Sequence, residues 1–308
     1  MGFGIKTKLK TLSSSFKYSL DLANKKDNEY LNVLLLCHSL EKGMGIPNVR
    51  KGYGQEKAGK LIEALSEMHN SGKTDLYEYR EALSILIAYF KYQDDAGIDI
   101  SSLKQKSESF IYDGTAPYHG GYQILNDDTF LKGKSIDFAS FINSRHSMRT
   151  YSNEEITEDE INQVISLAKR APSACNREPW KFYYSSNKNI TSHIAESLPA
   201  QSFIADIPYV GIVTVDKTLF NANEVNQWFI NGGIFSSFLI LAFHSVGIGS
   251  CIFQFPLYAK SKDQLRTLLN MPENEEIICG VGFGKYPTEA KCIFADRRPN
   301  NTIVINVQ

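Results

Sequence analysis

The sequence predicts an α+β protein that begins with an all-helical region. Two observations support this prediction. Up to about residue 133, apolar residues recur at helical spacing, and no stretch alternates in the manner of a strand. From residue 134 onward, helical patterns mix with short β-branched stretches without a regular strand–helix–strand order. We therefore expect two parts, residues 1–133 and 134–308, joined across a Gly- and Pro-containing stretch at 114–130.

The composition is that of a globular protein. The chain has 308 residues, of which 43% are hydrophobic and 22% charged, with a formal net charge of -1. That balance argues against nucleic acid or a membrane surface as a partner, so any anion site must be local. Five scattered cysteines without a CxxC or CxxH pair argue against a disulfide framework or a zinc site and favour the cytoplasm.

Neither targeting nor membrane insertion is expected. Lys6, Lys8 and Lys10 are not followed by an apolar segment, so the start does not resemble a secretory signal. The longest apolar run is interrupted by polar residues well short of a membrane span.

The first part should contain four helices. Their apolar faces predict helices near 31–43, 56–68, 75–92 and 101–112, with Gly43 ending the first. A glycine-rich loop at 43–54 follows the first helix. Around it, His38, Glu41, Lys42 and Arg50 form either a functional cluster or, as we prefer, charges near a helix C-terminus.

A short helix is expected over 135–148, capped by Ser135. Phe138, Phe141, Ile142 and Arg145 fall on one face, which predicts that Arg145 shares the buried face of this helix with two aromatic side chains. A buried charge needs a partner. A bound anion and a salt bridge to a distant carboxylate both satisfy that need, and the spacing does not separate them.

The second part contains one strongly marked helix and several strands. Thr157 and Glu160 form a capping box, and Pro172 ends this helix. A nearly all-apolar helix at 231–246 should be buried in a core or a subunit interface, with His244 in a structural role. The sequence further predicts strands at 181–185, 207–215, 276–284 and 302–307.

Several kinds of active site are absent from the sequence. Residues 280–284 read GVGFG, which is not the dinucleotide fingerprint GxGxxG. There is no Walker motif, no GxSxG elbow and no HExxH or DxDxDG metal motif. Cys175 has no histidine paired with it by any motif, so we expect it to be a packing residue rather than a nucleophile.

Groups that bind anions and amides remain, in separate loops. Arg145, His146, Ser147 and Arg149 supply donors after one helix, and Arg297 and Arg298 supply more near the C-terminus. Ser173 and Asn176 offer short polar groups on a turn. This pattern suits a flat, phosphorylated cofactor that is held without a Rossmann motif.

Four motifs in order resemble the FMN-dependent nitroreductase family over residues 138–300. They are SRHSMRTY at 144–151, APSACNREPW at 171–180, NGG at 231–233 with GIGSC at 247–251, and KYP with RRP at 285–287 and 297–299. Two positions depart from the family pattern. Glu178 replaces the usual Gln, and Ala295 stands where many members have Lys.

The resemblance implies a mixed sheet flanked by helices in a homodimer that holds FMN at the subunit interface. It assigns phosphate and ribityl contacts to one subunit and the 172–176 turn to the other. The backbone of residues 251–254 would pass the flavin ring, and either Arg297 or Arg298 would complete the phosphate site. The expected cofactor-binding residues are Arg145, His146, Ser147, Arg149, Pro172, Ser173, Ala174, Asn176, Gln201, Cys251, Ile252, Phe253 and Arg297.

The implied function is an FMN-dependent oxidoreductase. It would take hydride from NAD(P)H and reduce a nitroaromatic, a quinone or a similar acceptor by a ping-pong mechanism, with no dedicated catalytic side chain and no metal. The alternatives are flavin fragmentation, reductive dehalogenation, or FMN binding without catalysis. The helical region would either help select the substrate, through Tyr53, His38 and Arg50, or only add interface.

Overall fold

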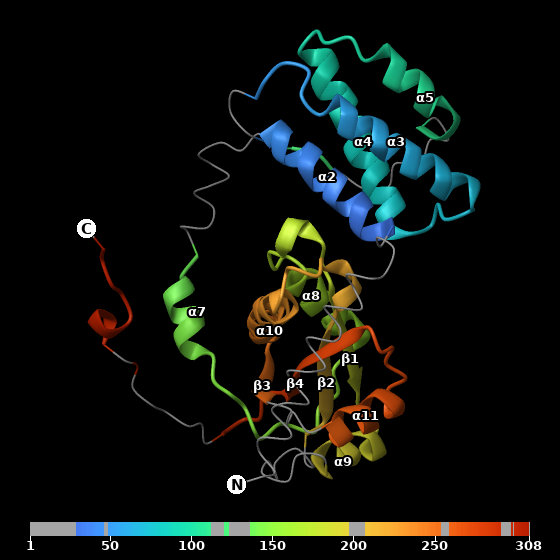
Figure 1. Cartoon of the computed structure of the whole chain (residues 1–308). Coiled ribbons are helices and arrows are strands. Elements are labelled where there is room, and N and C mark those ends of the chain that lie inside the picture. Colours follow the sequence, from blue (N-terminus) through green and yellow to red (C-terminus); the bar gives the residue numbers. More distant parts are fainter. Residues whose placement is uncertain are drawn as a thin grey trace. The chain divides into compact units, whose positions relative to one another are not determined.

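The computed structural model describes residues 29–45, 49–111, 120–122, 136–196, 207–253, 259–290, 297 and 299–307 (Figure 1). The chain divides into two compact units. The first comprises the residues up to Ile136 together with Pro172–Pro179 and Asp216–Asn231. The second comprises Asp137–Ala171, Trp180–Val215 and Gly232–Gln308.

Among its described residues, the first unit contains four helices (Figure 1): α2 (Glu29–Gly45), α3 (Gln55–Asn70), α4 (Tyr77–Asp95) and α5 (Ser101–Ile111). Each lies close to its predicted range. Helices α2, α3 and α4 contact one another, and α5 contacts α3 and α4. Leu40, Leu61, Leu65 and Leu86 are fully buried between them. The helical prediction for this region is confirmed for its described residues.

Two later stretches of chain belong to the same unit. The 3-10 turns η2 (Ala174–Asn176) and η4 (Lys217–Leu219) both contact α2. The unit therefore joins the N-terminal helices to part of the APSACNREPW motif. The predicted boundary at 133/134 stays a prediction, since residues 123–135 lie outside the described part of the chain.

A four-stranded sheet in the order β1-β2-β4-β3 forms the centre of the second unit. Its strands are β1 (Trp180–Ser185), β2 (Tyr209–Asp216), β3 (Ile248–Phe253) and β4 (Glu275–Lys285). β1 pairs with β2 in antiparallel register, Trp180 opposite Val215, and β3 pairs with β4 likewise, Ile248 opposite Lys285. A single parallel bridge joins Ser147 to Ser250.

The helices of this unit are α7 (Phe138–Ser144), α8 (Glu158–Ala168), α9 (Lys188–Glu196), α11 (Ala259–Leu268) and most of α10 (Gln227–Ser245). One core lies between α8, α10 and the sheet, where Val164, Leu239, Phe243 and Phe283 are fully buried. A second core forms around Ile194, Ile207 and Leu265. Helices and strands thus share both cores, and the α+β prediction is confirmed.

The start of α8 forms as its sequence predicts. The Thr157 side chain accepts a hydrogen bond from the Glu160 backbone, and the Glu160 carboxylate accepts one from the Thr157 backbone at 3.0 Å. This pair satisfies two of the N–H groups that a helix start leaves without partners. Ile161, Val164 and Ala168 then lie on the buried face of α8.

Helix α10 is the one helix among the described residues that is long and apolar enough to cross a membrane, and 44% of that window is buried inside the protein. The core helix of a soluble protein meets the same criteria. Phe235, Leu239 and Phe243 on this helix are buried in the core of the second unit, as the sequence predicts for a core helix.

Three features differ from the sequence predictions. The strand expected at 302–307 is wrong, because a 3-10 turn (Asn300–Thr302) leads into residues 303–307 that pair with no described strand. The helix expected over 135–148 is only 138–144, with Asp137 as its cap, while Ser135 lies outside the described residues. Helices α9 and α11 and strand β3 were not predicted.

Candidate functional site

The segment after α7 lies along the edge of β3. The Met148 backbone N–H donates to the Ser250 carbonyl at 3.0 Å, and Ser147 forms a parallel bridge with Ser250. Gly249 makes this close approach possible, since a Cβ atom there would lie 2.8 Å from Cγ of Met148. Residues 145–149 and 251–253, both expected to contact the cofactor, are thereby brought together.

Arg145 and Arg149 bring positive charge close to Cys251 at this edge of β3. Burial raises the pKa of the Cys251 thiol, while the charges of Arg149 and Arg145 and a hydrogen bond with Ser147 oppose that rise. Arg145 is half-buried and forms no ion pair with any described carboxylate. An anion placed here would provide the missing countercharge.

The predicted setting of Arg145 is wrong in one respect. Helix α7 contains no buried residue, and Phe138 is 58% exposed, so the expected buried aromatic face does not exist in the protomer. The chain becomes extended at Arg145 (φ -76°, ψ 123°), because it leaves the helix there to pair with β3. Arg145 is positioned by that pairing rather than by the face of a helix.

Tyr151 anchors the end of the segment that follows α7. Its single hydroxyl hydrogen is shared between the carbonyls of Met148, at 2.7 Å, and Gly282, at 3.2 Å. Burial raises the pKa of this phenol far above its usual range, so the hydroxyl remains a hydrogen-bond donor at any physiological pH. Strand β4 therefore helps to hold the segment against the sheet.

The turn at 172–179 belongs to the other compact unit and has an unusual backbone. Cys175, Asn176 and Glu178 all adopt positive φ angles of 45–52°, a region that L side chains rarely occupy. The Ser173 hydroxyl accepts the Glu178 N–H at 3.0 Å, and the Asn231 side chain accepts the Ala174 N–H at 2.8 Å. Strained backbone of this kind persists only where its surroundings hold it, which is common at ligand sites.

A buried arginine holds that turn. The Arg177 side chain is fully buried and forms a two-point ion pair with Glu224, at 2.6 and 2.9 Å. It also donates to the carbonyls of Ala174 and Leu219, and its guanidinium lies 4.8 Å from the centre of the Phe220 ring. These contacts link η2 to the chain around η4.

Sequence reasoning missed two residues in these contacts: Arg177 and Asn231. Arg177 occupies a variable place in its motif, and Asn231 was noted only as part of the NGG motif. His244 was expected to be structural. Its ring hydrogen-bonds both Ser144, at 2.9 Å, and Tyr286, at 2.7 Å. Contacts across 57 and 100 residues of sequence leave no local pattern that could have revealed them.

Some predicted site residues cannot be placed. Gln201 and Arg298 lie outside the described residues, as does Ala295, while Arg297 is described and exposed. Pro172, Ser173, Ala174 and Asn176 belong to the first compact unit, and the Arg145–Arg149 and Cys251–Phe253 segments to the second. Among the described residues, no group of His, Cys, Asp and Glu could hold a metal ion.

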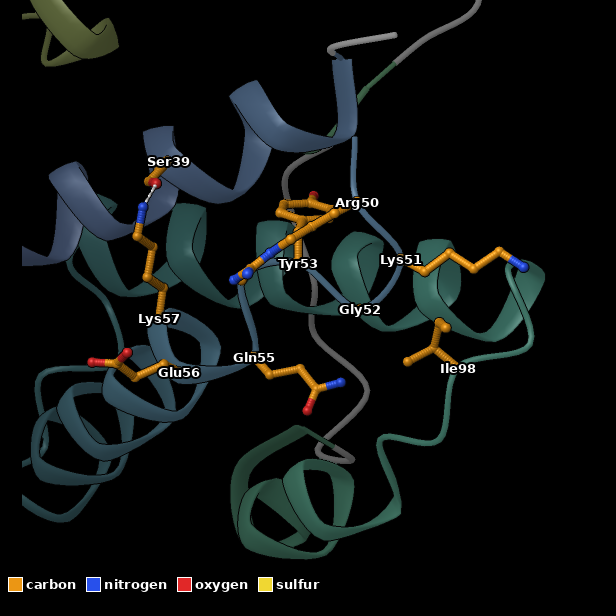
Figure 2. Close-up of a pocket in the computed structure, with 10 residues that line it drawn as sticks. Ser39, Arg50, Lys51, Gly52, Tyr53, Gln55, Glu56, Lys57 and Ile98 are labelled. Atoms are coloured by element: carbon orange, nitrogen blue, oxygen red, sulfur yellow. Dashed lines mark hydrogen bonds between the residues drawn. The ribbon is translucent and has the colours of Figure 1, made fainter. Parts of the chain in front are cut away.

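A pocket of about 660 Å³ lies within the helical unit, at the start of α3 (Figure 2). Its lining has three cationic side chains, Arg50, Lys51 and Lys57, and one carboxylate, Glu56, and Lys57 donates a hydrogen bond to Ser39 (Figure 2). Tyr53 also lines the pocket, but it is buried and donates to the Leu40 carbonyl at 2.8 Å. None of the residues assigned to FMN lines this pocket.

Comparison with known proteins agrees with the motifs. Residues 142–239 match the family model described as the Nitroreductase family. A Methanothermobacter thermautotrophicus protein with a provisional NADH dehydrogenase/NAD(P)H nitroreductase name is 29% identical over 51% of this chain and 81% of its own length. Iodotyrosine deiodinase from Hydra vulgaris is 25% identical over 61% of this chain and 78% of its own length.

The fold of the second part also has known counterparts. A crystal structure from Parabacteroides distasonis, of a protein with the same provisional nitroreductase name, covers 56% of this chain and all of its own, at a TM-score of 0.50 and 22% identity. That likeness concerns the fold alone. The family match over residues 142–239 and the order of the four motifs both point to a nitroreductase-like domain in this part of the chain.

Proposed function

We propose that the protein is an FMN-dependent oxidoreductase that accepts hydride from NAD(P)H and passes reducing equivalents to a small acceptor. One observation carries the proposal: Arg145, half-buried and without a described carboxylate partner, lies in a segment that pairs with β3. The match to the nitroreductase family model supports the cofactor class, and this edge of β3 has the positive charge that a flavin phosphate requires.

The residues present fit FMN. Arg145, His146, Ser147 and Arg149 would hold the phosphate and ribityl chain, and Cys251, Ile252 and Phe253 would lie along the flavin ring. Bound FMN would supply hydride-transfer chemistry. The protein would bind, orient and partly desolvate the reactants, which agrees with the lack of a nucleophile or metal motif. Arg297 would complete the phosphate site, with Arg298 as the alternative.

We propose that the active form is a homodimer in the cytoplasm, in which Pro172, Ser173, Ala174 and Asn176 contact the flavin of the partner subunit, with Gln201 near the same cofactor. Exposed apolar side chains on α7, α10 and β3 support an interface. They include Phe138, Ile142, Phe238 and Ile252. A form held monomeric should then fail to retain FMN.

Reductive dehalogenation is the second candidate. The specific observation is the match to iodotyrosine deiodinase, which covers more of this chain than the match to the archaeal nitroreductase relative. Both reactions would use the same flavin site, so the site residues do not separate them. The acceptor therefore has to be found by assay.

The test is a sequence of three measurements. Purified protein should carry or take up FMN, and anaerobic NADH or NADPH should bleach the flavin absorbance. Addition of a nitroaromatic, a quinone or an iodinated tyrosine to the reduced protein should then restore the absorbance. Flavin that neither nicotinamide reduces would exclude the proposed electron donor. Reoxidation by the iodinated tyrosine with release of iodide, and not by the other acceptors, would favour the second candidate.

A further inference from the structure

A chain of hydrogen bonds ends next to Arg145 and has no part in the function proposed above. The Tyr286 hydroxyl lies 2.7 Å from Nδ1 of His244, and Nε2 of the same ring lies 2.9 Å from Oγ of Ser144. Ser144 Oγ donates in turn to the Phe141 carbonyl at 3.0 Å. The chain joins the last turn of α10, the residue after β4 and the last turn of α7, all within one compact unit.

The donors in this chain can be assigned. Ser144 has a single hydroxyl hydrogen, which it gives to the Phe141 carbonyl, so towards His244 it accepts from Nε2–H. Nδ1 of a neutral ring is then the acceptor for the Tyr286 hydroxyl. Burial lowers the pKa of His244, and the nearby charges of Arg145 and His146 lower it further, against an opposing contribution from the Phe141 backbone. The neutral ring is therefore the form present at neutral pH.

This chain connects helix α7 to α10 and to the residue after β4. It contains no buried residue, and Phe138 and Ile142 on it are exposed. The His244 ring holds it by the Ser144 hydrogen bond and by contact with Phe141, with ring centres 4.8 Å apart. Arg145 is the next residue after Ser144. The stretch from Ser144 to Met148 is thus fixed by His244 at one end and by the Ser250 carbonyl at the other.

We propose that His244 is a positioning residue, which sets the direction of Arg145 through Ser144 and so determines how strongly the site prefers a phosphorylated flavin. This proposal rests on the proposed function, because it takes the anion at Arg145 to be the FMN phosphate. His244 itself would not touch the flavin. Its effect should therefore appear in the recognition of the phosphate rather than of the flavin ring.

The experiment compares FMN with riboflavin, which lacks the phosphate, in the full-length protein. The wild type should bind FMN more tightly. His244→Leu and Ser144→Ala should each lower the ratio of FMN affinity to riboflavin affinity about tenfold, the size expected when one well-oriented charged contact is lost. The affinity for riboflavin itself should change little. His244→Gln, whose amide can still reach toward Ser144, should keep most of the preference. His193→Leu, at an exposed histidine of α9, is the matched control and should behave as wild type.

The outcomes separate the two proposals. If the wild type binds neither flavin, or binds both equally, the proposed phosphate site is wrong, and the proposed role of His244 is then wrong as well. If the wild type prefers FMN and the His244 and Ser144 variants keep that preference, only the inference about His244 is wrong. Equal weakening of both flavins would show a merely structural role and would also overturn it. Should His244→Leu fold poorly, Ser144→Ala decides, because Ser144 is exposed.

Discussion

The backbone N–H of Met148 donates to the carbonyl of Ser250 at 3.0 Å. Met148 and Ser250 are 102 residues apart in the sequence. Two motifs meet through this bond, since Met148 belongs to SRHSMRTY and Ser250 to GIGSC. The arginines of the first motif lie beside the strand of the second as a result. The proposed flavin site is built on this pairing.

Arg145 should contribute directly to FMN affinity. Arg145→Ala removes a half-buried guanidinium that has no described carboxylate partner, so the protein should bind FMN at least about tenfold more weakly. Its stability without flavin should hardly change. Isothermal titration with FMN measures the effect, and Arg170→Ala, an exposed arginine beyond α8, is the control. Unchanged FMN affinity in Arg145→Ala would mean that the phosphate binds elsewhere.

The pairing itself can be disturbed at Gly249. A Cβ atom there would lie 2.8 Å from Cγ of Met148, so Gly249→Ala should push the 145–149 segment away from β3 and weaken FMN binding. Gly233→Ala is the matched control, because nothing lies within 4 Å of a Cβ at that exposed helical position. The control should be neutral, or stabilising by up to about 1 kcal/mol. Equal FMN affinity in both variants would show that the segment does not need its contact with β3.

The ion pair of Arg177 with Glu224 should matter more for stability than any exposed pair. Arg177→Met leaves the Glu224 carboxylate without its buried partner, which costs roughly 3–5 kcal/mol in typical buried pairs. Arg80→Met, which breaks a pair with the exposed Asp75, should cost no more than about 1 kcal/mol. Urea unfolding of both variants compares the two. Similar losses would mean that Arg177 does not hold the turn.

The ion pair of Arg177 with Glu224 should make the protein less stable in acid. Hydrogen bonds from Arg177 lower the pKa of Glu224 below its usual value in the folded protein. A carboxyl group with a lowered folded-state pKa stabilises the protein above its unfolded pKa, about 4.3, and this contribution disappears as the pH falls through the folded value. Arg177→Met should therefore lose less stability than the wild type when the pH is lowered from 6 to about 3.

Glu41 should have the opposite effect on how stability depends on pH. Burial, with a smaller contribution from Glu81, raises its pKa to about 7, against a hydrogen bond from the Gly121 N–H. A carboxyl group with a raised folded-state pKa favours the folded state fully below its unfolded pKa, and this advantage is lost as the pH rises through about 7. Glu41→Gln should raise the melting temperature at pH 8 by roughly 2–4 °C and change it little at pH 4. A shift of the same size at both pH values would contradict the assignment.

Local signals in the sequence predicted most of the fold. The capping box at Thr157, the β-branched run of β2 and the apolar faces of the four N-terminal helices act over a few residues, and each formed as expected. Helices α9 and α11 were missed because both are short and mostly polar. The expected C-terminal strand was wrong because alternation alone provides no partner strand.

Only those parts of the site that belong to a motif could be predicted from the sequence. SRHSMRTY and GIGSC were expected to contact one cofactor, and the structure does bring them together. The position of Arg145 was misjudged, because helical spacing was continued past Ser144, where the chain turns to pair with β3. Arg177 and His244 make contacts between distant parts of the chain, and the residues next to them in the sequence do not specify such contacts.

The most direct test of the account is titration of the purified, flavin-free protein with FMN. The account predicts saturable binding that yields a yellow protein, with a clear preference for FMN over riboflavin because Arg145 and its neighbours recognise the phosphate. A protein that remains colourless at saturating FMN would contradict the account at its centre.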